Sequence, residues 1–461
     1  MNEHSRLSTS RSYAFKAEKT KQDECLVRHG LIRWQALSGT ERFVCISIIL
    51  VPLWWVISWS YAPLLITIGI FTYQLVRYKS LGLSHPSLSA IALLVFAVYQ
   101  VILYRLNVPD GGPAGLLVPM QLWGSAGLLL WYVQSHQIRV RLPVIAWGFS
   151  MVALQATCYW LFAHFVLSEA YYTPVPNLLA RLLDKGTTYS SGKLGSVGNF
   201  LTPYIPDAKA FAGLVRYAFF FPHPTISSFF FGFSFLIALD LRNRILSFWL
   251  TGSSSFLILI CQSRNIWLTL PIVVLLRWIL TTGRTRGLAF LMALAATASF
   301  VMLSIPAVTD LVTDKVTATA DSASDLRKAS TEDRNKIYSR TWENIVEEPP
   351  IIGHSVPGPE VNPGYQFARI GTESFILGSL LYKAGFLGTG LFLTFLVSFS
   401  SWLYKTREDR PLCCFLILLL LSLSSAVTEF LPTEALILIL CTIASNSNIA
   451  HSHQSSRVNH A

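Results

Sequence analysis

Charged side chains are scarce in this sequence. Asp, Glu, Lys and Arg make up 13% of the 461 residues, whereas 52% of the residues are hydrophobic. This balance lies well outside the usual soluble composition, so it indicates a membrane protein. Acidic residues are fewer than basic ones, 25 against 36, which gives a formal net charge of +11.

Paired cysteines and metal-ligand motifs are missing as well. The seven cysteines show no CxxC pair, so structural disulfides are not expected. The sequence has no Walker loop, no GxGxxG turn and no metal-ligand spacing, and we therefore expect neither a cofactor nor a metal site. The first 40 residues are polar and lack a short apolar core before a cleavage site, so no secretory signal peptide is indicated.

Long apolar runs are what the sequence has instead. A helix needs roughly 17 to 25 mostly apolar residues to cross a bilayer, and such runs recur from Phe43 almost to the C-terminus. We therefore predict an all-α, polytopic integral membrane protein with about twelve transmembrane helices. They are expected at 43–59, 61–77, 87–104, 114–133, 143–166, 217–239, 245–261, 265–281, 287–306, 374–402, 411–428 and 431–447.

The positions of Lys and Arg orient these predicted helices. If both termini are cytoplasmic, every short inner segment is basic, whereas the short outer connections hold little beyond Arg105 and Arg264. The positive-inside rule therefore predicts cytoplasmic termini. It also disfavours the alternative in which 43–77 forms one tilted helix and a re-entrant piece. The net charge then reflects topology, and nucleic acid is not an expected partner.

Two long segments divide the predicted helices into groups. We expect a disordered cytoplasmic tail at 1–42 and a five-helix scaffold at 43–166, followed by a large extracytoplasmic loop at 167–216. Four helices follow at 217–306, then a second extracytoplasmic loop at 307–373, three helices at 374–447 and a cytoplasmic tail at 448–461. The second loop is expected to be partly helical, because Ile337, Trp342, Ile345 and Val346 recur near helical spacing before two prolines.

Three arginines are predicted to lie on the outer side. Arg216 precedes one expected helix, Arg264 stands at the outer end of another, and Arg340 falls in the second loop. The ordinary interpretation is that helix-end arginines reach the lipid headgroups. A guanidinium is also a planar, permanently charged fork that fits phosphate oxygens, so three of them could hold a diphosphate.

Four stretches of the C-terminal half follow one another in an order that is found in a known protein family. They are RYAFFFPHPTISSFFFGFSFLIAL (216–239), SRNIWLTLPIVVLL (263–276), SRTWENIVEEPPIIGHSVPG (339–358) and TESFILGSLLYKAGFLGTGLF (372–392). On these motifs the chain resembles the O-antigen ligase and O-antigen polymerase superfamily of bacterial glycosyltransferases. The N-terminal half agrees with this superfamily only in hydropathy.

The resemblance implies a function and a location. It implies that Arg216, Arg264 and Arg340 bind the diphosphate of a polyprenyl-linked oligosaccharide, such as an undecaprenyl diphosphate, in the bacterial inner membrane. A fixed cation can stabilise the negative charge that develops on the departing diphosphate of such a donor. The implied acceptor is a glycan or a lipid, and the implied further partners are a chain-length regulator and a flippase.

Glu373 is where the chain departs from the superfamily, whose members typically carry His there as the candidate base for the acceptor hydroxyl. A carboxylate can also accept that proton. Glu373 could instead be an ion-pair partner of Arg340 or Arg369. His354 could supply the imidazole from its adjacent turn, although a solvent-exposed turn histidine is the ordinary interpretation. For His223, a hydrogen bond at a helix start is favoured over catalysis.

The expected function is therefore an inverting glycosyltransferase at the outer membrane face. Polymerisation of capsular, exopolysaccharide or O-antigen repeat units is favoured over ligation of the glycan to a lipid acceptor. A transporter or flippase is the alternative from another class, but such proteins often have paired halves with charges inside the helices. Here the notable charges lie at outer helix ends, and the two halves do not resemble each other.

Overall fold

The computed structural model describes residues 26–28, 31–166, 174–184, 197–205, 215–286, 328–362 and 368–446. Within these ranges the chain is mostly helical. The predicted helix at 287–306 and the predicted tail at 448–461 lie outside the described residues, as does most of the tail predicted at 1–42. The described part of that first tail holds a hairpin and the first turn of a helix.

The N-terminal part of the chain contributes eight helical elements within the described residues. They are α2 (Gly39–Ile49), α3 (Val51–Ile57), α4 (Ala62–Tyr78), α5 (Leu88–Asn107), α6 (Pro113–Pro119), the π-helix η3 (Met120–Gly124), α7 (Ser125–Ser135) and α8 (Leu142–Phe165). Short 3-10 turns add η1 (Trp34–Ala36) and η2 (Trp59–Tyr61).

The C-terminal part of the chain is also mostly helical within the described residues. Its helices are α9 (Leu178–Leu182), α10 (Pro224–Asp240), α11 (Arg244–Cys261), α12 (Arg264–Arg286), α15 (Lys328–Glu347), the π-helix η7 (Phe375–Ala384), α16 (Gly385–Lys405), α17 (Cys413–Ser424) and α18 (Pro432–Ile443). The 3-10 turns are η5 (Val197–Asn199) and η8 (Arg407–Asp409).

The strands are two residues long and form four pairs, of which only β3 and β8 join parts of the chain that are far apart in sequence. Antiparallel pairs form between β1 (Val27–Arg28) and β2 (Leu31–Ile32), between β4 (Val175–Pro176) and β5 (Phe200–Leu201), and between β6 (Tyr204–Ile205) and β7 (Arg216–Tyr217). A parallel pair joins β3 (Val140–Arg141) to β8 (Ala444–Ser445).

Seven helices among the described residues are long and apolar enough to cross a membrane. They are Trp59–Tyr78, Leu88–Asn107, Gly115–Ser135, Leu142–Phe165, Arg244–Cys261, Arg264–Thr281 and Phe375–Lys405. The pair α2 and α3, bent by 60°, would make an eighth. Several apolar helices thus indicate a membrane-embedded protein, with fewer qualifying helices than the twelve expected from the sequence.

Part of the difference arises where described apolar runs are not helical throughout, and the predicted helix at 287–306 lies outside the described residues. The run at 217–239 becomes helical only at Pro224, because residues before it form β7 and a turn. The runs at 411–428 and 431–447 give α17 and α18, with 12 residues each. A helix that crosses a bilayer needs roughly 17 to 25 residues, so α17 and α18 are too short and α10, with 17 residues, is at the lower limit. Hydropathy records apolar composition but not where a helix begins.

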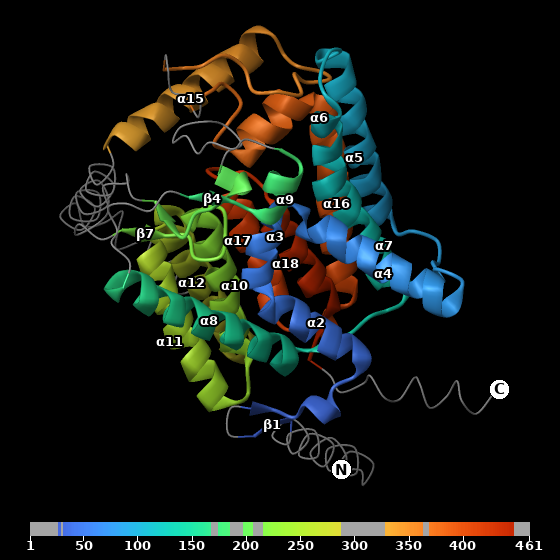
Figure 1. The fold of residues 1–461 in the computed structure, drawn as a ribbon, viewed down its shortest axis with the longest axis vertical. Coiled ribbons are helices and arrows are strands. Elements are labelled where there is room, and N and C mark those ends of the chain that lie inside the picture. Colours follow the sequence, from blue (N-terminus) through green and yellow to red (C-terminus); the bar gives the residue numbers. More distant parts are fainter. Residues whose placement is uncertain are drawn as a thin grey trace.

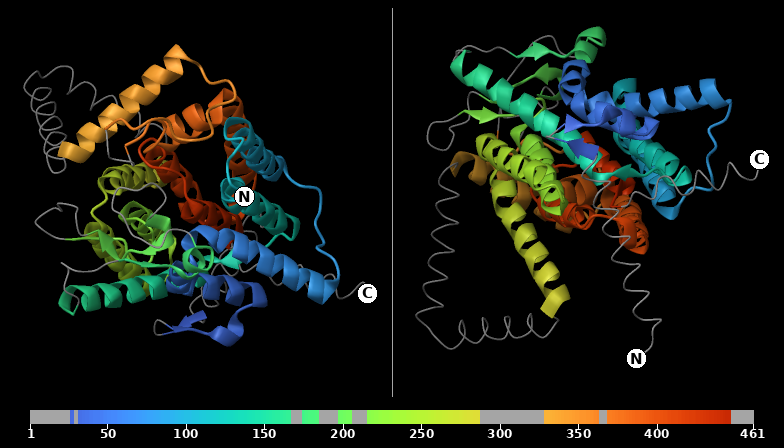
Figure 2. Two further views of the ribbon diagram at one scale, coloured as in Figure 1. Left: turned by 45° about the horizontal axis from the view of Figure 1, so that its top comes forward. Right: turned by 90° about the horizontal axis from the view of Figure 1, so that it is seen from below.

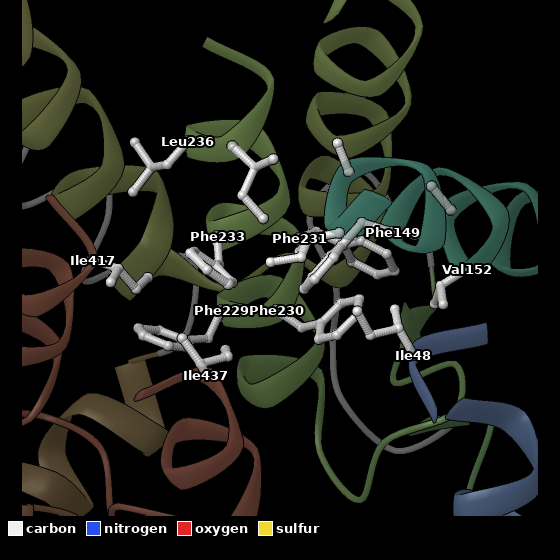
Figure 3. Packing of buried hydrophobic residues seen from close by; sticks show 14 of the residues in the cluster. Ile48, Phe149, Val152, Phe229, Phe230, Phe231, Phe233, Leu236, Ile417 and Ile437 are labelled. Carbon is white, nitrogen blue, oxygen red and sulfur yellow. The ribbon is translucent and has the colours of Figure 1, made fainter. Parts of the chain in front are cut away.

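α10 forms the centre of the molecule. It contacts α8, α11, α12, α17 and α18, and its apolar residues are buried on every side, as expected of a helix that is hydrophobic all round. Phe149 of α8 stacks on Phe230 at 4.5 Å between ring centroids and meets Phe233 edge-on at 5.5 Å. Figure 3 shows these rings interleaved with Ile48, Ile417 and Ile437.

α15 lies outside this helical core. It is the orange helix at the top of Figure 1, and the left view of Figure 2 shows it beside the darker orange segment that contains η7. The two helices are in contact. Pro349 and Pro350 follow α15 and prevent its continuation, because proline lacks a backbone N–H and restricts the residue before it. The chain then returns to the start of η7.

Candidate functional site

One face of α15 carries residues spaced for contact with η7. Arg334, Ile337, Tyr338 and Thr341 lie three or four positions apart, which places them on one side of a helix. Ile337 and Thr341 are 2% and 1% exposed. The buried face of α15 therefore brings Arg334 and Tyr338 to the turn that precedes η7.

Glu373 is the acidic residue at that turn. Its Oε2 lies 2.9 Å from Nη2 of Arg334, and the two side chains are about one-third exposed. The hydroxyl of Tyr338 donates a hydrogen bond to the backbone oxygen of Glu373 at 3.3 Å. Burial raises the pKa of Tyr338, Arg334 lowers it, and Glu373 raises it. The phenol therefore stays protonated near neutral pH and can keep donating this bond.

The turn that carries Glu373 is tightly bent. Gly371 has φ +80° and Glu373 has φ +65°, a left-handed conformation that costs a non-glycine residue roughly 1 to 2 kcal/mol. The N–H of Gly371 donates to Oγ1 of Thr341 at 3.0 Å, so α15 holds the turn in place. Strained non-glycine residues concentrate at functional sites, and this one bears the carboxylate that the sequence motifs single out.

The first amides of η7 are already engaged. Ser374 caps the helix by accepting from the N–H of Leu377 at 3.1 Å. The N–H of Phe375 donates to the carbonyl oxygens of Ser425 at 3.0 Å and Thr428 at 2.9 Å. A free helix start could bind an anion through its amides, but Phe375's amide is used internally. Anion binding at this place therefore depends on the arginine side chains.

Arg264 is a second cation that acts on this pair. It is the first residue of α12, and its positive charge and that of Arg334 repel each other through space. Such repulsion favours an anion between or beside the two guanidinium groups, because an anion relieves it. Arg264, Arg334 and Glu373 thus form what we call the Glu373 cluster.

Neither a known protein-family model nor a curated protein matches this chain. The resemblance to the O-antigen ligase and polymerase superfamily stays a prediction.

Arg216 lies near the same end of the helical core but in a different setting. It sits in β7 opposite Ile205, it is 7% exposed, and its charge acts on the thiol of Cys261 at the end of α11. Arg264 follows Cys261 by three positions, so Arg216 and Arg264 lie at the same end of the α11–α12 hairpin. Arg216 is held by a buried strand pair and does not open a helix.

Arg340 is not brought into the Glu373 cluster. Its side chain is 67% exposed, and Nη1 lies 3.6 Å from Oε2 of Glu343 on the same helix. It falls six positions after Arg334, which is most of two turns and places it off the buried face of α15. Arg369, the other partner considered for Glu373, donates from Nε to the backbone oxygen of Gly358 at 2.7 Å.

The two histidines have local roles. The N–H of His354 donates to the oxygen of Tyr382 at 3.1 Å, and its ring lies 4.4 Å from that tyrosine ring. It is therefore packed near the C-terminal end of η7, whereas Glu373 precedes the N-terminal end. His223 caps α10, its Nδ1 accepting from the N–H of Thr225 at 3.2 Å. The preferred interpretation of His223 as a helix-start hydrogen bond is confirmed.

Sequence reasoning missed Arg334 and Tyr338. The signal was available in the helical phase of 328–347, because Arg334 and Tyr338 share a face with the apolar residues Ile337 and Ile345, whereas Arg340 does not. Among the described residues, no three His, Cys, Asp or Glu side chains are placed so as to hold a metal ion.

Proposed function

We propose that this protein is a membrane glycosyltransferase that uses a polyprenyl-diphosphate-linked glycan as donor. In this proposal it polymerises capsular, exopolysaccharide or O-antigen repeat units at the extracytoplasmic face of the bacterial inner membrane. The observation that carries the proposal is the Glu373 cluster. Its carboxylate contacts the guanidinium of Arg334 where α15 packs against η7, and the charge of Arg264 acts on Arg334 through space.

In the proposed reaction Glu373 is the base. Its carboxylate removes the proton from an acceptor hydroxyl, and the hydroxyl oxygen forms a bond to the anomeric carbon of the donor sugar. The bond between that carbon and the diphosphate oxygen breaks on the opposite face, so the anomeric configuration inverts. The electron pair of the broken bond leaves with the polyprenyl diphosphate.

The arginines serve the leaving group in this scheme. Arg264 and Arg334 are cations whose mutual repulsion is relieved when an anion binds, so they favour the diphosphate and the charge that develops on it. Arg334 also contacts Glu373 directly, and this contact holds the carboxylate in place for its role on the acceptor side. The leaving diphosphate departs on the opposite face, and in this scheme Arg264 is the cation that serves it there.

Tyr338 and Thr341 position the base. Tyr338 binds the backbone oxygen of Glu373, and Thr341 binds the N–H of Gly371, so both ends of the turn are attached to α15. A base must lie within hydrogen-bond reach of the proton that it takes. Movement of α15 relative to η7 would therefore move Glu373 and reduce turnover without altering any charged group.

Deletion of the gene tests the reaction class, with analysis of the lipid-linked glycans that accumulate. A polymerase predicts single repeat units on the polyprenyl carrier at the outer face, because the upstream flippase still delivers them. Lipid-linked polymer that is not transferred would instead indicate a ligase. Units confined to the inner face would indicate a flippase and contradict the proposal.

A further inference from the structure

An apolar groove lies between α2, α4, α7 and α18. Its volume is about 680 Å³, within the roughly 300 to 1,000 Å³ of typical ligand sites. The walls include Phe43, Ile70, Leu129, Leu436 and Leu440. In Figure 1, α4 extends away from the body of the molecule while α2 turns downward, so the two helices diverge. We call this space the α2–α4 groove.

The groove is open along one side, and two glycines, which have no side chain, help to form it. Tyr73 and Tyr78 of α4 line it and are each 61% exposed, and Phe43 of α2 is 47% exposed. Gly39 and Gly69 also line it, and a Cβ added at either position would meet nothing within 4 Å. In a protein embedded in a bilayer, such an opening faces lipid chains.

Trp59 lines one end of the groove. This residue is 4% exposed, and its Nε1 donates to Oγ1 of Thr433 at 2.5 Å. Its ring also meets Phe221 edge-on at 5.1 Å between centroids. Phe221 follows β7, so this end of the groove is the one nearer Arg216.

Two exposed cations flank the other end of the groove. Tyr78 lines the groove, and its sequence neighbours Arg77 and Lys79, at the end of α4, are exposed beside it without lining it. A lipid chain that moves from the bilayer into an apolar groove gains little transfer energy, because lipid chains are themselves apolar. Selectivity for one lipid must then come from its headgroup, and exposed Lys and Arg favour an anionic one.

We propose that the α2–α4 groove is a binding site for an anionic glycerophospholipid. An acyl chain lies along α4 and α18, and the phosphate lies against Arg77 and Lys79. None of the residues of the Glu373 cluster lines the groove. The proposal goes beyond the proposed glycosyltransferase activity and does not depend on it, because binding is measured without any donor substrate.

Native mass spectrometry of the purified full chain tests the headgroup. Phosphatidylglycerol is expected to remain bound in preference to phosphatidylcholine. Arg77→Gln and Lys79→Gln should each weaken its retention by about fivefold, the effect of removing one cation near an anionic lipid. Arg244→Gln, which removes an exposed cation at the start of α11, is the control and should change nothing. Equal retention of both lipids, or equal loss in the control, would overturn the proposal.

A second variant tests the groove itself. Gly69→Trp fills the groove from α4, and it should abolish selective retention of phosphatidylglycerol. Gly252→Trp is the matched control, because Gly252 lies on α11 and an added Cβ there also meets nothing within 4 Å. Thermal unfolding checks that both variants are folded. Selective retention that survives in Gly69→Trp would show that the lipid binds elsewhere.

Discussion

At the scale of single residues, the candidate site depends on which face of α15 a side chain occupies. Arg334 and Arg340 are six positions apart on one helix, yet Arg334 contacts Glu373 whereas Arg340 is exposed beside Glu343. The sequence motif drew attention to Arg340, which stands in the stretch that resembles the superfamily. The structure instead places Arg334, six positions earlier, against Glu373.

This contrast gives the first prediction. Arg334→Gln should lower turnover of a polyprenyl-diphosphate donor by roughly 100- to 1,000-fold, the range seen when a group that stabilises transition-state charge is removed. Arg340→Gln removes the same charge from the exposed face of the same helix and should leave turnover within about twofold. Initial rates with saturating donor would measure both. Similar losses in the two variants would mean that the net charge of α15 matters and the contact with Glu373 does not.

At the scale of elements, much of the helical pattern follows from hydropathy, whereas the turns that form the site do not. Long apolar runs at 87–104 and 143–166 gave helices close to the predicted positions, because burying or lipid-exposing those residues requires a helix. The bend before η7 could not be predicted, since nothing local distinguishes a glutamate with φ +65°. That conformation is imposed by Thr341, Tyr338 and the contacts of Ser425.

The turn before η7 should be sensitive to one methyl group. Gly371→Ala places a Cβ 2.3 Å from Cδ1 of Tyr382 in a backbone with φ +80°, so we expect a loss of stability of at least about 1 kcal/mol from the backbone alone. Gly390→Ala, inside α16 with nothing within 4 Å of the added Cβ, should be neutral or gain up to about 1 kcal/mol. Thermal unfolding in detergent would compare them. An unchanged melting temperature for Gly371→Ala would show that the turn is not under this constraint.

At the scale of the whole molecule, basic residues predicted to lie on the inner side join elements far apart in the chain. Arg141 makes two short contacts with Glu41, at 2.6 and 2.8 Å, and thereby ties α8 to α2. Arg410 donates to the carbonyl oxygens of Cys441 and Thr442 at the end of α18. Charge counting predicted where these residues would lie relative to a membrane, but it said nothing of these partners, which depend on tertiary packing.

Arg141 in β3 and Arg139 just before it should therefore differ in their effect on stability. Arg141→Ala leaves Glu41, which is 3% exposed, without its ion-pair partner, and loss of one member of such a buried pair costs about 3 to 5 kcal/mol. Arg139→Ala breaks a pair with Asp409 in which both side chains are over one-third exposed, and it should cost less than about 1 kcal/mol. Unfolding of the purified variants in one detergent would rank them. The reverse order would show that the Glu41 pair does not tie α2 to α8.

The most direct test of the central claim is in vitro turnover of a purified polyprenyl-diphosphate oligosaccharide by the wild type, Glu373→Gln and Glu373→His. The amide cannot accept the hydroxyl proton, whereas an imidazole can. We predict turnover by the wild type, its loss in Glu373→Gln and its partial recovery in Glu373→His. Unchanged turnover in Glu373→Gln would make Glu373 only a structural partner of Arg334, and no turnover in the wild type would contradict the glycosyltransferase assignment itself.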